Sequence, residues 1–137
     1  MNQENSVKSQ KKRTLSILVV EDNLINLRLL VASLTRIGHR VEQASDGRAA
    51  IEKFLENKYD VILMDIMMPL MDGVTATKEI RKLEQEKGIS GKKRVKIIAV
   101  TANVLENERE LFLAAGMDEM MNKPIDIKEL QKYLFLE

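Results

Sequence analysis

Apolar and polar residues alternate along this chain with two different periods, one typical of strands and the other of helices. Short, nearly continuous apolar runs indicate strands that are buried on both faces of a sheet. Longer stretches with apolar residues three or four positions apart indicate amphipathic helices. The predicted strands are 15–20, 41–44, 61–64, 95–100 and 117–121. The predicted helices run from 23 to about 37, from 46 to about 57, from 72 to about 86, from about 105 to 115, and from 126 onward.

Polar residues and glycines mark the ends of these helices. Asn23, Asp46 and Asp126 are N-cap residue types, whose side chains accept hydrogen bonds from amide groups of the first helical turn. Gly38 and Gly116 can adopt the left-handed backbone conformation that ends many helices. Because each strand reaches the next through a helix, we expect parallel strands with right-handed crossovers. The sequence therefore predicts an α/β fold, a doubly wound five-stranded parallel sheet in a three-layer sandwich.

Length and composition fit one domain. Residues 1–13 are polar, lack periodicity and are predicted to be a disordered segment or linker, which leaves 14–137 as the domain. The net charge of +1 provides no overall field for nucleic acid or an anionic membrane, so neither is expected as a direct partner. The absence of cysteine excludes a disulfide framework and a thiolate metal site. With no apolar stretch long enough to span a membrane, these features suit a cytoplasmic protein.

The residues with chemical potential are concentrated at the carboxyl ends of the predicted strands. Asp65 follows the apolar run 61–64, where a carboxylate costs free energy unless it is solvated, paired or bound to metal. The other polar residues at strand ends are Glu21 and Asp22, Thr101, and Lys123. Parallel strands bring these ends to one edge of the sheet, where ligand sites of open α/β folds form. Taken singly, each residue could be a helix-start acid, a strand-end hydroxyl or a solvated loop lysine, but their conjunction favours a function.

The residue types at this edge predict metal-assisted phosphoryl transfer. Carboxylates without His or Cys select a hard cation, and few carboxylates with room for water fit Mg²⁺ better than Ca²⁺. A cation among Glu21, Asp22 and Asp65 would relieve their repulsion and leave one Asp65 oxygen free to attack phosphorus, forming an acyl phosphate. Lys123 and Thr101 could hold phosphoryl oxygens as point charge and hydrogen-bond donor.

The motifs around these residues resemble a known family, the receiver domain of two-component response regulators. The similarity extends over about residues 15–136 in order and spacing. The segments that carry it are Val20–Asn23, Met64–Gly73, Ala99–Asn103, Ala115–Asp118 and Lys123–Pro124. The resemblance implies a flavodoxin-like fold and a phosphorylation-dependent switch in which Asp65 accepts a phosphoryl group from a phosphohistidine. It also implies that Asp22, Asp65 and the backbone carbonyl of Met67 bind Mg²⁺, with Glu21 assisting through water.

The resemblance assigns the remaining site residues to the phosphoryl group and the switch. Thr101 and Lys123 would contact the phosphoryl oxygens, and the peptide bond before Pro124 is commonly cis in the family. Many receivers carry a Tyr or Phe three residues before the lysine, where this chain has Met120. A thioether can fill the space but lacks a planar ring. We therefore expect any switch through Met120 to differ from the usual aromatic one.

Within the family, Glu21–Asn26, Met71–Gly73 and Thr101–Asn103 are most similar to receivers of hybrid sensor histidine kinases and phosphorelays. The expected partner is a histidine kinase or a histidine phosphotransfer domain, and the segment 105–134 resembles the region through which receivers form homodimers. The expected activity is not that of an enzyme with external turnover, because a receiver catalyses only its own phosphorylation and dephosphorylation.

Two other functions fit parts of the pattern. An aspartyl-phosphate phosphatase usually has a second acid two residues after its nucleophile, where this chain has Met67. A non-phosphorylated interaction module on the same fold would not need the complete set of acids, threonine and lysine.

Elsewhere, His39 is predicted to be a plain turn residue. The loop Lys92–Arg94 is predicted to be solvated, with docking of an acidic partner as the alternative.

Overall fold

The computed structural model describes residues 13–102 and 106–135, apart from the side chains of 106 and 107. Five strands form one parallel sheet in the order β2-β1-β3-β4-β5. The strands are β1 (Ser16–Val20), β2 (Arg40–Ala44), β3 (Val61–Asp65), β4 (Lys96–Thr101) and β5 (Glu119–Asn122). The helices are α2 (Leu24–Ile37), α3 (Gly47–Glu56), α4 (Gly73–Glu86), α5 (Glu106–Ala115) and α6 (Ile127–Leu134), with a 3-10 turn η1 (Gly91–Lys93).

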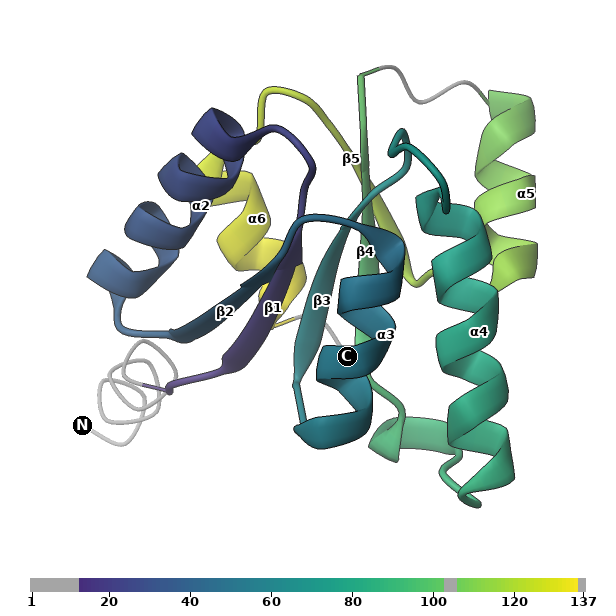
Figure 1. Ribbon diagram of the computed structural model, residues 1–137. Helices are drawn as coiled ribbons and strands as arrows, with labels where there is room; N and C mark the ends of the chain where they lie inside the picture. Colours follow the sequence, from purple (N-terminus) through teal and green to yellow (C-terminus); the bar gives the residue numbers. More distant parts are fainter. Residues whose placement is uncertain (1–12, 103–105, 136–137) are drawn as a thin grey trace.

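Helices cover both faces of this sheet, as Figure 1 shows: α2 and α6 pack on one face, and α3, α4 and α5 pack on the other. The predicted doubly wound parallel sheet in three layers is therefore confirmed. The strand bounds differ from the predicted ones by one or two residues, and both Asp65 and Thr101 are the last residues of their strands rather than the first residues beyond them. The prediction for residues 1–13 concerns residues that, except for Arg13, lie outside the described part of the chain.

The strand residues supply two cores, because successive side chains of a strand point to opposite faces of the sheet. On β1, Leu18 and Val20 belong to the core under α3, α4 and α5, whereas Ile17 and Val19 belong to the core under α2 and α6. All five residues of β3 are buried, which explains the nearly continuous apolar pattern of this central strand. Burial on both faces holds the carboxyl end of β3 in place, and this end carries Asp65.

The predicted caps fix where the helices begin and end. Asn23, Asp46 and Asp126 each cap a helix, accepting hydrogen bonds from the amide groups of Asn26, Ala49, and Lys128 and Glu129 respectively. At the end of α2, Gly38 has a φ of +117°, which is the left-handed conformation expected for a helix-ending glycine.

One residue differs from its prediction: His39 is buried and bonded rather than a plain turn residue. Gly38 turns the chain so that the imidazole inserts between the start of β1 and α6. Its Nδ1 accepts a hydrogen bond from the Leu15 amide at 3.1 Å, and its Nε2 lies 3.2 Å from Gln131 Oε1. Because Nδ1 is an acceptor here, Nε2 carries the proton and donates a hydrogen bond to Gln131 Oε1.

None of the helices in the described part of the chain combines the length and the apolar character needed to cross a bilayer.

Candidate functional site

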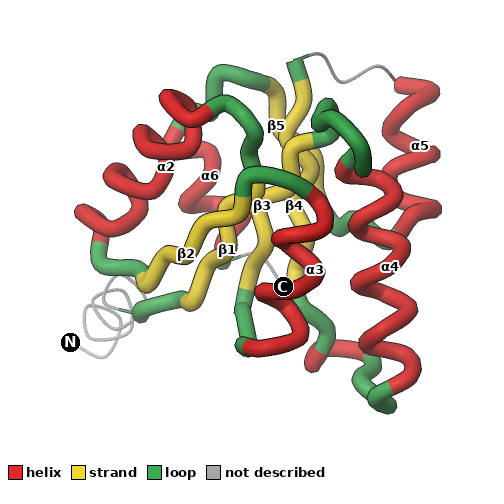
Figure 2. The backbone as a smooth tube through the Cα atoms, viewed as in Figure 1, coloured by secondary structure: helices red, strands yellow, loops and turns green. Residues whose placement is uncertain are grey.

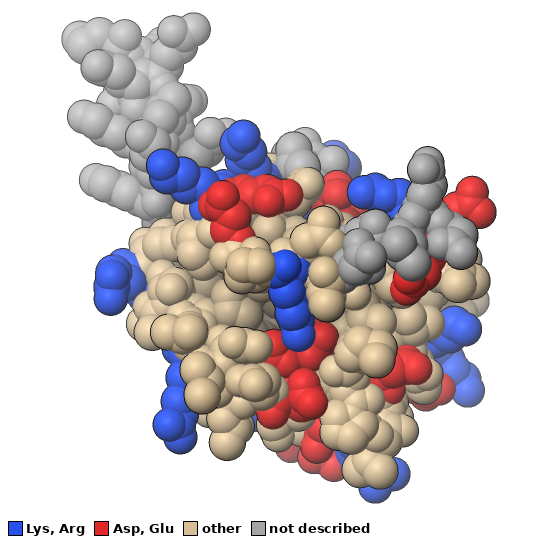
Figure 3. Space-filling view, turned by 90° about the horizontal axis from the view of Figure 1, so that it is seen from above, with Lys and Arg blue, Asp and Glu red and all other residues tan. Residues whose placement is uncertain are grey.

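The predicted polar residues lie together at the carboxyl edge of the sheet. Asp65 is the last residue of β3 and Thr101 the last of β4, whereas Glu21 and Asp22 follow β1 and Lys123 follows β5. The loops after β1, β3 and β5 meet at this edge, which is uppermost in Figure 2. Figure 3 looks down onto the edge and shows acidic side chains gathered near its centre, beside a basic side chain that reaches across to them. Residues from distant parts of the sequence therefore form one site.

Lys123 joins two buried carboxylates of this site. Its Nζ lies 3.1 Å from Glu21 Oε1 and 3.1 Å from Asp65 Oδ1. Glu21 and Asp65 are only 3% and 2% exposed, so their charges are largely removed from water. Two carboxylates that close to one ammonium group leave a net negative charge in the site, which favours binding of a further cation or a proton.

The two carboxyls have pKa values displaced in opposite directions. Burial raises the pKa of Asp65 to about 7, and the hydrogen bond with Glu21 adds to this effect while Lys123 opposes it. Burial alone would also raise the pKa of Glu21, but its interactions with Asp65 and Lys123 outweigh burial and hold that pKa at about 2. The pKa of Lys123 lies above its ordinary value, because its bonds to both acids outweigh its own desolvation. Below about pH 7 the pair therefore shares a proton that resides on Asp65.

The carboxylates also fit a divalent metal. Glu21, Asp22 and Asp65 can each offer one oxygen such that all three ligand atoms lie within 4.8 Å of one another. Asp65 Oδ2 is buried and has no hydrogen-bond partner among the described residues, which is costly for a carboxylate oxygen unless a cation completes its surroundings. Asp22 is exposed, so water can occupy further coordination positions. Hard oxygen donors with access to water suit Mg²⁺.

The other predicted residues surround this carboxylate cluster. The Met67 amide donates a hydrogen bond to Asp65 Oδ1 at 3.3 Å, while the Met67 side chain is exposed. The Thr101 carbonyl accepts a hydrogen bond from the Lys123 amide at 2.8 Å, which fixes the two residues relative to each other. Met120 is buried in the core under α3, α4 and α5. The Lys123–Pro124 peptide bond is cis, as predicted.

Sequence reasoning missed the groups that hold Glu21. The Asn26 side chain donates to Glu21 Oε1 and the Asn23 amide donates to Glu21 Oε2, both at 3.4 Å. The spacing of Asn26 five residues after Glu21 was the available signal, since it places Asn26 in the first turn of α2, just after the loop that carries Glu21. Exposed apolar side chains also rim the site: Leu24, Ile25, Leu29, Met67 and Leu70. Leu24, Ile25 and Leu29 lie off the core face of α2, and this departure from amphipathic spacing could have revealed them.

Comparison with known proteins gives a consistent set of relatives. The family described as "Response regulator receiver domain" matches residues 17–135. Hybrid signal transduction histidine kinase M of Dictyostelium discoideum is 42% identical over 87% of this chain, which corresponds to 5% of that protein. Response regulator SSK1 of Arthrobotrys oligospora is 35% identical over 87% of this chain and 13% of its own length. The chain thus spans only a small part of these relatives.

Solved structures show the same architecture. The receiver domain of sensor histidine kinase PA1611 from Pseudomonas aeruginosa, with a magnesium ion coordinated in its active-site cleft, is 41% identical with a TM-score of 0.74, covering 89% of this chain and 95% of that one. The receiver domain of Ssk1 from Saccharomyces cerevisiae, crystallised with the histidine phosphotransfer protein Ypd1, is 28% identical with a TM-score of 0.82, covering 88% and 86% of the two chains.

Proposed function

The chain belongs to the response regulator receiver domain family, and from this premise we propose that Asp65 is the residue that accepts the phosphoryl group. Receiver domains act in two-component and phosphorelay signalling as phosphoacceptor switches. The observation that carries the assignment to Asp65 is its position: a buried carboxylate at the end of the central strand, 3.1 Å from Lys123 and next to two further acids.

Transfer to Asp65 would follow ordinary nucleophilic chemistry. A carboxylate oxygen of Asp65 forms a bond to phosphorus as the bond between phosphorus and the histidine nitrogen of the donor breaks. The electron pair of the broken bond returns to the imidazole, which takes up a proton. Asp65 must be deprotonated to react, and a cation held by the carboxylates would favour this form by taking the place of the shared proton.

Magnesium is the cofactor of this site, and the donor set fits it. Asp22, Asp65 and the backbone carbonyl of Met67 would hold the ion, with Glu21 assisting through water. The bound ion would neutralise negative charge that gathers when a phosphoryl group meets three carboxylates. The same groups of this chain would position the reactive oxygen of Asp65 whether the donor is a protein or a small molecule.

Phosphorylation would then be sensed by Lys123 and Thr101. An acyl phosphate adds a charge of about −1.5 to −2. We propose that the Lys123 ammonium moves from the Asp65 carboxylate to a phosphoryl oxygen, and that the Thr101 hydroxyl donates to another. Thr101 ends β4 and Lys123 directly follows β5, so their movement would shift the loops that follow these neighbouring strands. Met120, beside them on β5 and packed in the core, would adapt through its flexible side chain rather than by an aromatic ring flip.

The proposed partner is a histidine kinase or a histidine phosphotransfer domain. Supporting this choice, the Ssk1 receiver was crystallised with such a protein, and hybrid histidine kinases are among the relatives. We further propose that the domain turns over no external substrate, lies in the cytoplasm, and makes no direct contact with nucleic acid or membrane. Homodimerisation through the region 105–134 stays a prediction.

The proposal is tested by phosphate incorporation from acetyl phosphate in the presence of Mg²⁺, measured by intact-protein mass. We expect one added phosphoryl group in the wild type and none in Asp65→Asn, an isosteric change that removes the nucleophile. Glu86→Gln removes an exposed acid at the end of α4 and should leave incorporation unchanged. Undiminished labelling of the Asp65→Asn protein would show that another residue is the acceptor.

A further inference from the structure

The edge of the molecule opposite Asp65 carries a hollow of about 710 Å³. It lies at the amino ends of the strands, between the start of β1, the residues before β3, the turn η1 and the end of α6. Its lining combines apolar side chains with charged ones. The apolar lining includes Leu15, Tyr59, Val95 and Leu134, all of which are buried. The hollow therefore has an apolar floor beneath a charged rim.

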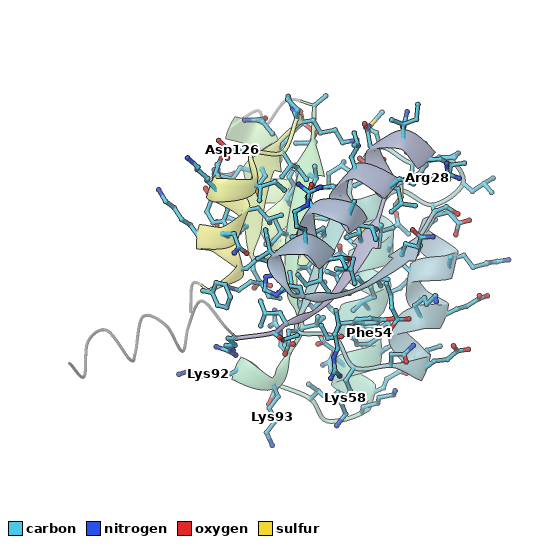
Figure 4. All side chains as sticks on the ribbon, turned by 90° about the vertical axis from the view of Figure 1, so that its left-hand side faces the viewer. Arg28, Phe54, Lys58, Lys92, Lys93 and Asp126 are labelled. Atoms are coloured by element: carbon cyan, nitrogen blue, oxygen red, sulfur yellow. The ribbon has the colours of Figure 1, made fainter. Side chains whose placement is uncertain are left out.

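The rim carries unpaired positive charge. Lys92, Lys93 and Arg94 follow one another along the rim, are exposed, and form no salt bridge with any residue in the described part of the chain. Figure 4 shows Lys92 and Lys93 projecting from the same lower edge as Lys58, far from Arg28 at the other end of the molecule. A chain whose net charge is only +1 thus concentrates cations at this edge.

Three acids line the hollow, fewer than its five basic residues: the acids are Asp60, Asp118 and Glu119, and the basic residues are Arg13, Lys92, Lys93, Arg94 and Lys96. Asp60 Oδ2 accepts a hydrogen bond from the Ser16 amide at 2.8 Å. Asp118 Oδ2 accepts one from the Ile97 amide at 2.8 Å and lies 2.9 Å from Arg81. The charge of Asp118 is thus met by Arg81, which lies outside the hollow, and the two remaining acids are outnumbered by the basic residues of the lining. The unmet charge in the hollow is therefore positive.

We propose that this hollow, the amino-edge groove, docks a short acidic segment of a partner protein that also presents apolar side chains. Carboxylates of the segment would pair with Lys92, Lys93 and Arg94, and its apolar side chains would cover the floor formed by Leu15 and Val95. Charge complementarity supplies the attraction, and the apolar floor supplies the buried contact. The groove therefore selects a segment with both carboxylates and apolar side chains.

The shape and lining disfavour other polyanions. An anionic membrane is a broad surface that would meet the tips of Lys92 and Lys93 without reaching the floor of the hollow. A single nucleic-acid strand needs exposed aromatic faces on which bases can stack. Of the two aromatic residues of the lining, Tyr59 is buried, and Phe135 is half-buried with its ring 6.1 Å from that of His39. An extended peptide is narrow enough to enter the hollow and can carry both carboxylates and apolar side chains.

Docking at the amino-edge groove would leave phosphorylation unobstructed, because the groove and Asp65 lie at opposite ends of the same strands. A partner could therefore remain bound while a phosphodonor visits the carboxyl edge. The inference does not depend on Asp65 being the phosphoacceptor, since none of its residues belongs to that site. An Asp65→Asn protein should bind the segment as the wild type does, which separates failure of this inference from failure of the proposed function.

The test is fluorescence anisotropy of a short fluorescein-labelled peptide in which Leu and Phe are flanked by Glu, titrated with the full 137-residue chain. We expect saturable binding that weakens with added salt. The variant Lys92→Glu/Lys93→Glu should weaken binding about tenfold or more, because it replaces attraction by repulsion. Arg28→Glu/Arg48→Glu makes the same change in net charge at exposed positions outside the groove and should have little effect. Thermal unfolding midpoints establish that both variants are folded.

Matched probes identify the occupant. A peptide with Gln in place of each Glu, and one with Ser in place of Leu and Phe, should both bind more weakly than the parent. Phosphatidylserine vesicles and a single-stranded RNA oligonucleotide should fail to displace the parent peptide. The inference is overturned by absence of saturable binding, by equal binding to the Lys92→Glu/Lys93→Glu protein, or by displacement of the peptide by vesicles or RNA.

Discussion

At the scale of single residues, Lys123 serves two buried carboxylates at once, and this arrangement controls how the site titrates. The ammonium group can neutralise only one of the two negative charges, Glu21 or Asp65, at its 3.1 Å distances. Below about pH 7 a proton removes the second charge when no metal is present. The same arrangement prepares the site for a phosphoryl group, since Lys123 is already placed beside the carboxylate that would become an acyl phosphate.

The raised pKa of Asp65 predicts that stability depends on pH when divalent metal is removed. Folding lifts this pKa from 3.8 to about 7, so between these values the folded chain holds a proton that the unfolded chain has lost. Stability should therefore fall as pH rises through this interval. Glu21, with its pKa lowered from 4.5 to about 2, affects stability only at lower pH. In EDTA, the urea midpoint should be lower at about pH 8 than at about pH 5.5.

The control for this pH dependence is Asp65→Asn, which has no carboxyl to titrate. Its urea midpoint should change much less between the same two pH values than that of the wild type. An equally steep dependence in Asp65→Asn would mean that another group is responsible. Saturating Mg²⁺ should also flatten the wild-type profile at higher pH, because a bound cation takes the place of the proton.

The sequence was enough to predict where a site residue lies when that residue ends or directly follows a strand. Asp65, Thr101 and Lys123 each terminate or follow an apolar run, so their convergence follows from a parallel sheet without knowledge of any distance. His39 was not predictable in this way. Its burial results from contacts with β1 and α6, and neither the neighbouring glycine nor the local pattern shows which element will cover it.

At the scale of elements, the closest approach in the site is that of α4 to the end of β3. A Cβ atom at Gly73 would collide with the Asp65 carbonyl oxygen, and the Gly73 amide donates to the Ile66 carbonyl at 3.0 Å. The glycine at the start of α4 therefore allows the loop after β3 to fold back against the strand. The position of Asp65 depends on this close packing.

Gly73→Ala is expected to disturb the site through that contact. The added methyl must displace the backbone of Asp65 or the start of α4, at a cost of about 1–3 kcal/mol in unfolding free energy. The rate of phosphate incorporation from acetyl phosphate should fall as well, because the nucleophile moves. Thr75→Ala, at an exposed position of the same helical turn, is the matched control for both measurements. A stable Gly73→Ala protein with the wild-type labelling rate would contradict the positional role of this contact.

A second link between elements is made by Arg81 of α4. Its guanidinium donates to the carbonyls of Gly116 and Val95, both at 2.8 Å, and pairs with Glu84 at 2.7 Å and Asp118 at 2.9 Å. Glu84 is only 2% exposed and also accepts a hydrogen bond from the Val95 amide at 2.7 Å. One side chain therefore ties α4 to the end of α5 and to the amino ends of β4 and β5.

Removing this link should be strongly destabilising. In Arg81→Met, Glu84 keeps its burial but loses its positive partner, which typically costs about 3 kcal/mol or more. We expect a correspondingly lower urea midpoint at neutral pH. The double variant Arg81→Met/Glu84→Gln should recover part of the loss, because no uncompensated charge then remains buried. A double variant whose stability equals the sum of the two single losses would indicate that the two side chains act independently.

Element boundaries follow closely from the sequence where a cap is present, and less closely elsewhere. Asn23 and Asp46 cap helices at the predicted residues because the capping hydrogen bond is local. The last strand was predicted at 117–121 but lies at Glu119–Asn122. Its bounds depend on register with β4, where Glu119 pairs with Ile98, and such long-range pairing leaves no mark in the local pattern.

At the scale of the whole molecule, the two edges of the sheet differ in how far the sequence predicts them. The carboxyl edge collects polar residues from the ends of individual strands, so the alternation of strands and helices was enough to predict it. The amino-edge groove combines residues from both ends of the domain, Arg13 and Phe135 among them, with a loop between α4 and β4. No single segment indicates a hollow there, and only the folded chain shows that Lys92 and Arg94 border an apolar floor.

The carboxylates of the carboxyl edge come together only in the folded chain. Metal binding there should therefore stabilise the whole fold against unfolding. Glu21 and Asp22 are separated from Asp65 by more than 40 residues of sequence and are brought together by the pairing of β1 with β3. A cation that binds the folded form alone stabilises it by about 2.7 kcal/mol at a concentration of about 100 times its Kd. Mg²⁺ should therefore raise the urea midpoint of the wild type progressively, whereas Asp65→Asn and Asp22→Asn should respond much less. NaCl at matched ionic strength controls for screening, and an equal response of all three proteins to Mg²⁺ would place the ion elsewhere.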